Sequence, residues 1–574
     1  MPRSSTWGAR SGTALLAALA VLLSTAPTVS ATGESGNPAP DVVPSLREWS
    51  GGEGAMKLGQ GSRIVIDSHD EKALTSEAQT LSGDVAEVTG LTMPVAVAPR
   101  PKDGDVFLSL QDADPALGSQ GYALKVGDAA AIRGNGDIGV FHGTQTLLQI
   151  LKTTSGHRSL PRGEARDWPQ QQERGYLLDA GRRYYSPDFI VQTIREMSYL
   201  RLNTLQLHLS DHNAFRLVSE RHPWLAAPQA YTRADIRRFE AAARKYHVTI
   251  IPEIEMPSHA SAILKGRPDL AFKCPELGGT VDVTNPEARK FTASLIEEFA
   301  PLFSGPEFHI ATDEYARQAE QERCPELVRY AKEHGFASTP DVFVDYINEM
   351  NKLVRAQGKH TVIWNWWDVD QNPTIHPDKN IKVEAWTTAA ESGADHSAQK
   401  YLDMGYEVVA SPSDLLYVTP GFPLLPDAKS LYEEWEPMEH PRLAGYQISV
   451  WSDNAISRPD SYFDAHLRRP REVLADRTWG RPPTRHGGGL LRPRRRHRHA
   501  TRHPRLHAAR PAVGQDVWHQ PGLGQLVQHL RQGLRRRCGH QLPVRGTERR
   551  LHRHRPRCRA RLHHFDGPVL PRSQ

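Results

Sequence analysis

Residues 307–315 read Glu-Phe-His-Ile-Ala-Thr-Asp-Glu-Tyr and place two adjacent carboxylates directly after a short apolar run. The alternation of Phe308 and Ile310 predicts a buried strand, whose carboxyl end presents Asp313 and Glu314. Most Asp-Glu pairs are solvated residues of turns or helix starts, so the pair alone does not indicate catalysis. Here the pair ends a hydrophobic strand within a long series of alternating strand and helix patterns, and this context favours an active site.

The alternation of strands and helices continues on both sides of this segment. Apolar runs predict eight buried parallel strands at Gly175–Ala180, Thr204–Ser210, Val248–Glu255, Glu307–Thr312, Thr361–Trp367, Lys382–Trp386, Glu407–Ser411 and Tyr446–Trp451. Helical patterns between them include Pro187–Leu200, Arg233–Tyr246, Pro286–Phe299, Asp341–Gln357 and Ala398–Met404, and a further helix is predicted at Pro470–Trp479. Eight strands separated by helices predict an α/β fold, a (β/α)₈ TIM barrel over residues 168–480.

A smaller domain is expected before the barrel. Residues 32–45 are rich in Gly, Pro and Ser and are interpreted as a linker, and residues 46–167 mix strand and helix patterns. The predicted strands are Arg63–Asp67, Asp105–Leu110 and Gly121–Val126, and the predicted helices are Lys72–Thr89 and Val140–Leu151. This mixture predicts a small α+β domain.

The first 31 residues have the pattern of a secretory signal. Arg3 and Arg10 precede an apolar run over Ala14–Leu23, and small residues end at Ala31, where cleavage is expected. The apolar run is too short for a membrane helix, which needs roughly 18 to 20 residues. We therefore expect an extracellular protein with no membrane partner.

Residues 481–574 differ in composition from the rest of the chain. This segment is dominated by Arg, His, Pro, Gly and Leu and contains no Lys, Ile, Met, Asn or Tyr, which is not the composition of a folded domain. A nucleic-acid-binding tail is one interpretation, but an exported protein has little use for one. Translation of a GC-rich gene in the wrong frame is the favoured explanation, so the segment is expected to be disordered and no nucleic-acid partner is predicted.

Two of the four cysteines, Cys274 and Cys324, lie in sequence predicted to be globular, and Cys538 and Cys558 lie in the altered tail. Cys274 and Cys324 follow strands that end at the same face of the barrel, so either a bridge between loops or two buried thiols is expected. No spacing resembles a zinc site and no His-Glu-x-x-His occurs, so neither a metal nor another cofactor is predicted.

The carboxyl ends of the predicted strands share a composition suited to sugars. They carry several Trp residues, carboxylates, an arginine and histidines: Asp179, Arg182, Asp211, His212, Glu255, His259, Asp313, Glu314, the segment from Trp364 to Asp368, Trp386, Tyr417, Trp451 and Asp453. Any single Trp there could simply be a core residue. Together, flat aromatic rings and charged groups around a carboxyl pair predict glycoside hydrolysis.

Four motifs resemble those of family 20 glycoside hydrolases in order and spacing: Leu178–Arg183, His208–Phe215, Pro252–His259 and His309–Glu314. The segment Gly139–Leu148 is similar to the end of that family's small N-terminal domain. The family contains β-N-acetylhexosaminidases and lacto-N-biosidases, and the resemblance implies a retaining, substrate-assisted mechanism. In it, the 2-acetamido oxygen of the substrate attacks its own anomeric carbon and forms an oxazolinium intermediate.

The resemblance also implies a role for each matching residue. Glu314 would be the general acid and base, kept protonated in part by Asp313, which would orient the acetamido N–H; Tyr417 would donate to the acetamido oxygen. The remaining substrate-binding residues are Arg182 on the sugar hydroxyls, Asp211 and His259 in support, Asp453 on outer hydroxyls, and Trp364 or Trp366 with Trp386 and Trp451 around the acetyl group.

The chain departs from the family pattern at several of these positions. Ala311-Thr312 stands where Gly-Gly is usual, His212 and Glu255 each replace an Asp, and Asp453 replaces the Glu common in hexosaminidases. The expected function is release of terminal β-linked N-acetylhexosamine from glycans or chitooligosaccharides. The shorter Asp453, and Tyr315 after the acids, favour the alternative of a lacto-N-biosidase that releases a disaccharide, whereas Arg182 favours single-sugar recognition. A non-catalytic glycan-binding protein is a third possibility.

Overall fold

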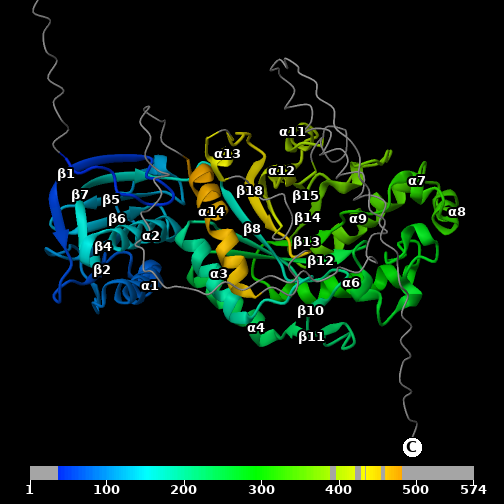
Figure 1. Cartoon of the computed structure of the whole chain (residues 1–574), viewed down its shortest axis with the longest axis horizontal. Coiled ribbons are helices and arrows are strands. Elements are labelled where there is room, and N and C mark those ends of the chain that lie inside the picture. Colours follow the sequence, from blue (N-terminus) through cyan, green and yellow to red (C-terminus); the bar gives the residue numbers. More distant parts are fainter. Residues whose placement is uncertain (1–35, 388–395, 420–427, 434, 454–458, 481–574) are drawn as a thin grey trace, which may run out of the picture. The chain divides into compact units, whose positions relative to one another are not determined.

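The computed structural model describes residues 36–387, 396–419, 428–433, 435–453 and 459–480. In this part of the chain, two regions each have their own sheet and hydrophobic core (Figure 1). The expected signal sequence 1–31 and the altered segment 481–574 lie outside the described residues, and those two expectations stay predictions. Among the described residues, no helix has the length and apolar content needed to cross a membrane.

The first region is a seven-stranded sheet with two helices. Its strands lie in the order β1 (Glu48–Lys57), β7 (Ser159–Asp167), β5 (Tyr122–Val126), β6 (Ala130–Gly134), β4 (Val106–Ser109), β2 (Ile64–Ile66) and β3 (Val95–Val97). The pairs from β1 to β6 are antiparallel and those from β6 to β3 are parallel. Helices α1 (Glu71–Thr89) and α2 (Asp137–Thr153) pack on this sheet and bury leucines such as Leu74 and Leu147. The predicted α+β domain before the barrel is confirmed.

Helix α2 approaches the sheet closely at a glycine. A Cβ atom on Gly143 would lie 2.4 Å from Ile132 Cγ2 and 3.0 Å from Tyr122 Cδ2, closer than packed atoms come. A side chain at this position would therefore push α2 away from β5 and β6. This close approach explains why position 143 is a glycine, which the helical pattern alone does not reveal.

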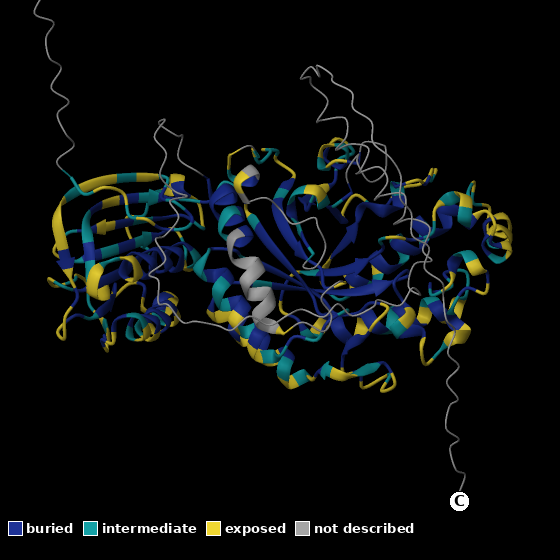
Figure 2. Cartoon of the chain, viewed as in Figure 1, coloured by how far each residue is buried: buried dark blue, intermediate teal, exposed yellow. Residues whose placement is uncertain are grey.

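The second region is a closed barrel of eight parallel strands. In order around the barrel they are β8 (Glu173–Asp179), β9 (Thr204–His208), β12 (Thr249–Met256), β13 (Glu307–Ala311), β14 (His360–Trp364), β15 (Lys382–Ala385), β16 (Glu407–Ala410) and β18 (Leu443–Val450). Pairing of β16 with β18 closes the ring. The strands are buried over most of their length (Figure 2), as expected when helices cover a parallel sheet. The predicted (β/α)₈ barrel is confirmed.

Helices connect most of the barrel strands and surround them. The longer ones are α3 (Pro187–Tyr199), α4 (Arg233–Lys245), α6 (Pro286–Phe299), α9 (Thr339–Ala356) and α14 (Asp460–Trp479). Local sequence sets where these helices start: Ser186 caps α3, and Thr232 forms a capping box with Asp235 at α4. The final helix was expected to begin at Pro470, but it begins at Asp460 and contains Pro470. The expected start followed the preference of proline for the first turn of a helix, which does not apply here.

Candidate active site

Asp313 and Glu314 lie just beyond the carboxyl end of β13. The backbone turns there through positive φ angles at Ala311 (56°), Thr312 (78°) and Glu314 (45°). Residues with a Cβ seldom adopt such angles, and a β-branched residue such as Thr312 is strained there. This strain explains why the family motif that this segment resembles usually has Gly-Gly in place of Ala311-Thr312. The turn gives the two acids different environments, because the Asp313 side chain is 13% exposed and that of Glu314 is 53% exposed.

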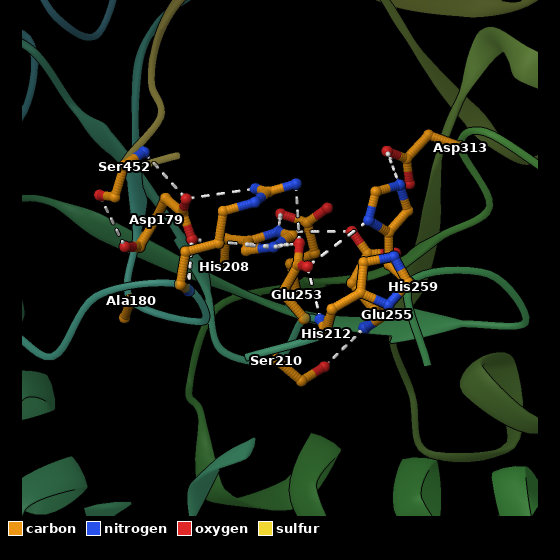
Figure 3. A network of polar contacts seen from close by, with 12 residues as sticks. Asp179, Ala180, His208, Ser210, His212, Glu253, Glu255, His259, Asp313 and Ser452 are labelled. Carbon is orange, nitrogen blue, oxygen red and sulfur yellow. Dashed lines mark hydrogen bonds and ion pairs between the residues drawn. The ribbon is translucent and has the colours of Figure 1, made fainter. Parts of the chain in front are cut away.

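His259 lies close to Asp313 (Figure 3), and it also contacts Glu314 and Asp211. Its Nε2 atom is 3.0 Å from Glu314 Oε2 and 3.7 Å from Asp313 Oδ2, and its Nδ1 atom is 3.5 Å from Asp211 Oδ1. Burial disfavours a charged imidazole, but the surrounding carboxylates raise the pKa of His259 well above its ordinary value. His259 therefore carries a positive charge near neutral pH.

The charge on His259 affects the pKa values of the two acids to different extents. Burial raises the pKa of Asp313, and the nearby charge of His259 only partly offsets it. Desolvation acts on Glu314 in the same direction, but the hydrogen bond and charge of His259 outweigh it and lower the Glu314 pKa. The expectation that Asp313 keeps Glu314 protonated is therefore wrong for this structure. Sequence reasoning placed His259 in the site but not in contact with Glu314.

Arg182 joins acids from three strand ends. Its Nη1 is 3.2 Å from Asp179 Oδ2, its Nη2 is 2.9 Å from Asp211 Oδ2 and its Nε is 3.1 Å from Asp453 Oδ1. Asp179 and Asp211 are buried, whereas the Asp453 side chain is 46% exposed. The guanidinium is thus fixed in the site, and Asp453 is the carboxylate of this group that a ligand can reach.

An aromatic wall adjoins the acid pair. Trp364 and Trp451 form a small apolar cluster with Ala311 at the end of β13, and Trp386 and Tyr417 pack against it. The indole N–H groups of Trp386 and Trp451 are buried and have no hydrogen-bond partner among the described residues. The wall therefore offers flat apolar faces and two polar donors next to the carboxylates.

Trp366, which was predicted as an alternative to Trp364 in this wall, is not a member of the small cluster but packs against Trp386. It stacks on Trp386 with ring centroids 5.9 Å apart, and Trp386 stacks in turn on Tyr417 at 6.0 Å. Trp366 belongs to the main barrel core, and its Nε1 donates to the Tyr315 main-chain oxygen at 2.6 Å. Of the two alternatives, Trp364 belongs to the cluster with Ala311 and Trp451, and Trp366 supports Trp386 by stacking on it.

A buried carboxylate beneath the wall was not among the predicted site residues. Glu253 of β12 accepts hydrogen bonds from Trp364 Nε1 at 2.8 Å and from Gln206 Nε2 at 3.0 Å, and it lies 3.0 Å from His208 Nδ1. Burial opposes ionisation, but the charge of His208 dominates and lowers the Glu253 pKa to about 2. His208 Nε2 reaches Asp211 Oδ2 at 3.0 Å, so Glu253 supports both the wall and the Arg182 cluster.

Glu253 could have been predicted as a site residue because it is an acid within a hydrophobic run. The residues Ile250, Ile251 and Ile254 around it read as a core strand, and an ionised side chain is rarely placed in such a strand without a partner. Glu255, one of the departures from the family pattern, is also buried. Burial and the charge of Asp313 raise its pKa well above the ordinary value, which favours the neutral form of this side chain.

Cys274 and Cys324 form a disulfide, which decides between the two alternatives left open by the sequence. Cys274 lies in the connection after β12, and Cys324 precedes α8 (Pro325–Glu333) in the connection after β13. The bridge therefore joins the loops that follow the strands carrying His259 and the acid pair.

Removing this bridge should destabilise the protein. The double variant Cys274→Ser/Cys324→Ser opens a loop with a sequence separation of 50 residues, for which chain entropy predicts a loss of about 4 kcal/mol. Urea unfolding of the oxidised protein and the variant measures this loss, and reduced wild-type protein should behave as the variant does. An unchanged unfolding midpoint would show that the bridge does not stabilise the fold.

The sequence matches two domains of one known enzyme family. The catalytic domain of glycosyl hydrolase family 20 matches residues 172–453, and domain 2 of the same family matches residues 39–168. The chain belongs to glycosyl hydrolase family 20. The acid pair, Arg182 and the aromatic wall lie within or at the edge of the first match, as the resemblance of the motifs predicted.

Curated relatives are 24–29% identical to the chain over the aligned residues. Lacto-N-biosidase from Bifidobacterium bifidum is 29% identical over 470 residues, which cover 78% of this chain and 41% of the relative. β-Hexosaminidase subunit A1 from Dictyostelium discoideum is 27% identical over 390 residues, covering 65% and 70% respectively. The chain thus spans less than half of that lacto-N-biosidase.

Solved family 20 structures share the fold. The β-N-acetylhexosaminidase from Streptomyces coelicolor A3(2) superposes with a TM-score of 0.64 at 23% identity, covering 78% of this chain and 92% of that one. The exo-β-N-acetylglucosaminidase from Vibrio harveyi, in complex with N-acetylglucosamine, gives 0.66 at 21% identity, covering 79% and 76%. At these identities the likeness establishes the fold, and the chemistry rests on the site itself.

Proposed function

We propose that this family 20 protein is a secreted glycosidase that releases terminal β-linked N-acetylhexosamine by substrate-assisted catalysis. The observation that carries the proposal is the placement of Asp313 and Glu314 next to the aromatic wall, with Asp313 Oδ1 buried and without a hydrogen-bond partner among the described residues. A buried acceptor without a partner is costly, and a donor on a bound substrate would satisfy it. The acetamido N–H of an N-acetylhexosamine is such a donor.

Asp313 and the wall would act together on the acetamido group. Hydrogen bonding to Asp313 holds the N–H and favours attack by the acetamido oxygen on the anomeric carbon of the same sugar, which gains from proximity. The negative form of Asp313 stabilises the positive charge that develops on the oxazolinium ring. Trp364, Trp386 and Trp451 would enclose the acetyl methyl, and Tyr417 would donate to the acetamido oxygen.

Glu314 would protonate the leaving oxygen and then activate water. Its half-exposed side chain is accessible to a glycan bound in the site. His259 holds the carboxylate at 3.0 Å, so this bond fixes the orientation of Glu314 but also favours its ionised form. Arg182, already neutralised by acids, would bind the sugar hydroxyls with Asp453, and Asp211 and His259 would support the site.

Replacing His259 with asparagine should move the alkaline limb of the pH profile. A general acid works in its protonated form, so activity falls as the pH rises through its pKa. Because His259 lowers the Glu314 pKa, its loss should raise that pKa and shift the alkaline limb of kcat/KM to higher pH. The measurement is kcat/KM against pH for both proteins. A limb that stays in place, or shifts to lower pH, would contradict the pairing of His259 with Glu314.

A lacto-N-biosidase is the second candidate, and one specific observation favours it. Asp453 is the exposed member of the Arg182 cluster, and the shorter acid leaves room beside the outer sugar hydroxyls. The similarity to the lacto-N-biosidase from Bifidobacterium bifidum agrees with this alternative. The Arg182 cluster still favours a single terminal sugar, so N-acetylhexosamine release remains our first proposal. Substrates would be N-acetylhexosamine-containing glycans, including chitooligosaccharides.

Two chromogenic substrates separate the candidates. We expect release of the chromophore from a β-N-acetylglucosaminide and little release from the same chromophore linked to lacto-N-biose. The reverse preference would establish the disaccharide-releasing alternative. If the protein binds N-acetylglucosamine but cleaves neither substrate, the third interpretation, a non-catalytic glycan-binding protein, would replace both.

Detection of the protein in culture medium, with residue 32 at its N-terminus, tests secretion and the predicted cleavage after Ala31.

A further inference from the structure

We propose that Asp211, His212 and His259 form a binding site for a divalent transition-metal ion, which zinc fits best. One ligand atom from each of these residues lies within 4.8 Å of the other two. Two imidazoles and one carboxylate are a common set of protein ligands for zinc, with the fourth position left to water or another ligand. This site goes beyond the proposed hydrolysis, which uses no metal.

The distance between Asp211 and His259 suits shared coordination better than a hydrogen bond. Asp211 Oδ1 and His259 Nδ1 are 3.5 Å apart, and His259 Nδ1 is buried without a hydrogen-bond partner among the described residues. Ligand atoms at about 2.0–2.2 Å from a tetrahedral zinc lie roughly 3.3–3.6 Å from each other. An ion between these two atoms therefore needs little movement of either side chain.

Other contacts already hold both of these ligands in place. Asp211 Oδ2 binds Arg182 and His208, which leaves Oδ1 with the His212 main-chain N–H at 2.5 Å and a further lone pair. His259 Nε2 contacts Glu314, which leaves Nδ1 for a metal that displaces the Nδ1 proton as it binds. Contacts at the second polar atom of a metal ligand orient the first, and they are typical of built metal sites.

His212 completes the set from the solvent side. Its Nδ1 contacts Ser261 Oγ at 2.9 Å, so Nε2 is the nitrogen left for a ligand, and its ring lies 4.7 Å from the ring of His259 (Figure 3). The His212 side chain is exposed and can turn toward an entering ion. Where the family motif usually has Asp, this chain has an imidazole, and nitrogen ligands favour zinc over magnesium or calcium.

The charge around the three ligands favours a cation. Asp313 and Glu314 lie on the far side of the His259 ring, at 3.7 and 3.0 Å from its Nε2. Arg182 opposes a cation, but its charge is shared among the carboxylates of Asp179, Asp211 and Asp453. The ligands follow two strands that are far apart in the sequence. They therefore do not form one of the short ligand spacings by which a zinc site is recognised in a sequence, and no metal was predicted. Because the ion would sit beside the acid pair, it should inhibit the proposed reaction.

Equilibrium dialysis of the full chain against zinc tests the site without turnover. Residues 481–574 contain further histidines, so the difference between variants is the measurement. We expect His212→Ala to bind one zinc fewer per chain than wild type at micromolar zinc, and His376→Ala, which removes an exposed histidine elsewhere, to bind as wild type does. Equal zinc binding by wild type and His212→Ala would overturn the proposal. Equal melting temperatures establish that the variants are folded.

Inhibition supplies a second, local measurement. Zinc should inhibit chromogenic turnover by wild type and by His376→Ala. The variant His212→Ala should need at least tenfold more zinc for half inhibition. In the presence of a chelator, its activity should stay within about twofold of that of wild type. Magnesium should not inhibit any of the three proteins. Identical zinc inhibition of wild type and His212→Ala would contradict the site. If no protein turns over the substrate, the proposed function fails, and the dialysis result still decides the metal site.

Discussion

Glu314→Gln should lower kcat/KM for N-acetylglucosaminides with poor leaving groups by about 10² to 10⁴, the usual worth of a general acid and base. The amide keeps the size of the side chain but can neither deliver a proton to the glycosidic oxygen nor remove one from water. Folding should hardly change, because the Glu314 side chain is half exposed. Steady-state kinetics with a natural-type disaccharide measures the loss.

The leaving group provides the control for this prediction. A nitrophenolate needs little protonation, so the first step of Glu314→Gln should be impaired much less with a nitrophenyl glycoside than with the disaccharide. Glu322→Gln, at an exposed carboxylate outside the site, should behave as wild type with both substrates. Equal losses for good and poor leaving groups would contradict the assignment of Glu314 as the acid.

Asp313→Asn should have an effect of similar size for a different reason. Asparagine cannot place a negative charge beside the developing oxazolinium ring, and one misplaced electrostatic contact of this kind costs about 10² to 10³ in kcat. The loss should appear mainly in kcat, because charge on the acetamido group develops only in the transition state. A thiazoline that mimics the bicyclic intermediate should lose more affinity for the variant than N-acetylglucosamine does.

The stability of Asp313→Asn separates catalysis from folding. Burial raises the Asp313 pKa in the folded protein, so ionisation of this side chain disfavours folding as the pH rises above its unfolded pKa. A neutral amide removes that cost, and the variant should be at least as stable as wild type at pH 7. Urea unfolding checks this. A large loss of stability together with activity would assign Asp313 a structural role instead.

The barrel could be predicted from sequence because its strands are buried on both faces. Parallel strands covered by helices are continuous apolar runs. Each predicted run overlaps an observed barrel strand, and their bounds differ by a few residues. β1 (Glu48–Lys57) gave no such signal. It is an edge strand with mostly exposed side chains and three glycines, and it is held by main-chain pairing to β7. Pairing of this kind leaves no pattern in one sequence.

The site residues could be predicted one by one, but their contacts could not. Motif positions identified Asp313, Glu314 and Arg182 because each follows a strand. That His259 would bind Glu314 depends on the relative orientation of two loops, which the sequence does not encode locally. The same holds for Trp366, whose stacking on Trp386 depends on the short 3₁₀ turn after β14.

The identity of the nucleophile is the central claim, and a series of substrates tests it directly. Replacing the acetamido methyl hydrogens by one, two and three fluorines makes the carbonyl oxygen progressively less nucleophilic without changing the leaving group. If the substrate supplies the nucleophile, log kcat/KM should fall steeply and steadily along the series. Rates that stay nearly level across all four substrates, accompanied by a glycosyl ester trapped on an enzyme carboxylate, would contradict substrate-assisted catalysis by this protein.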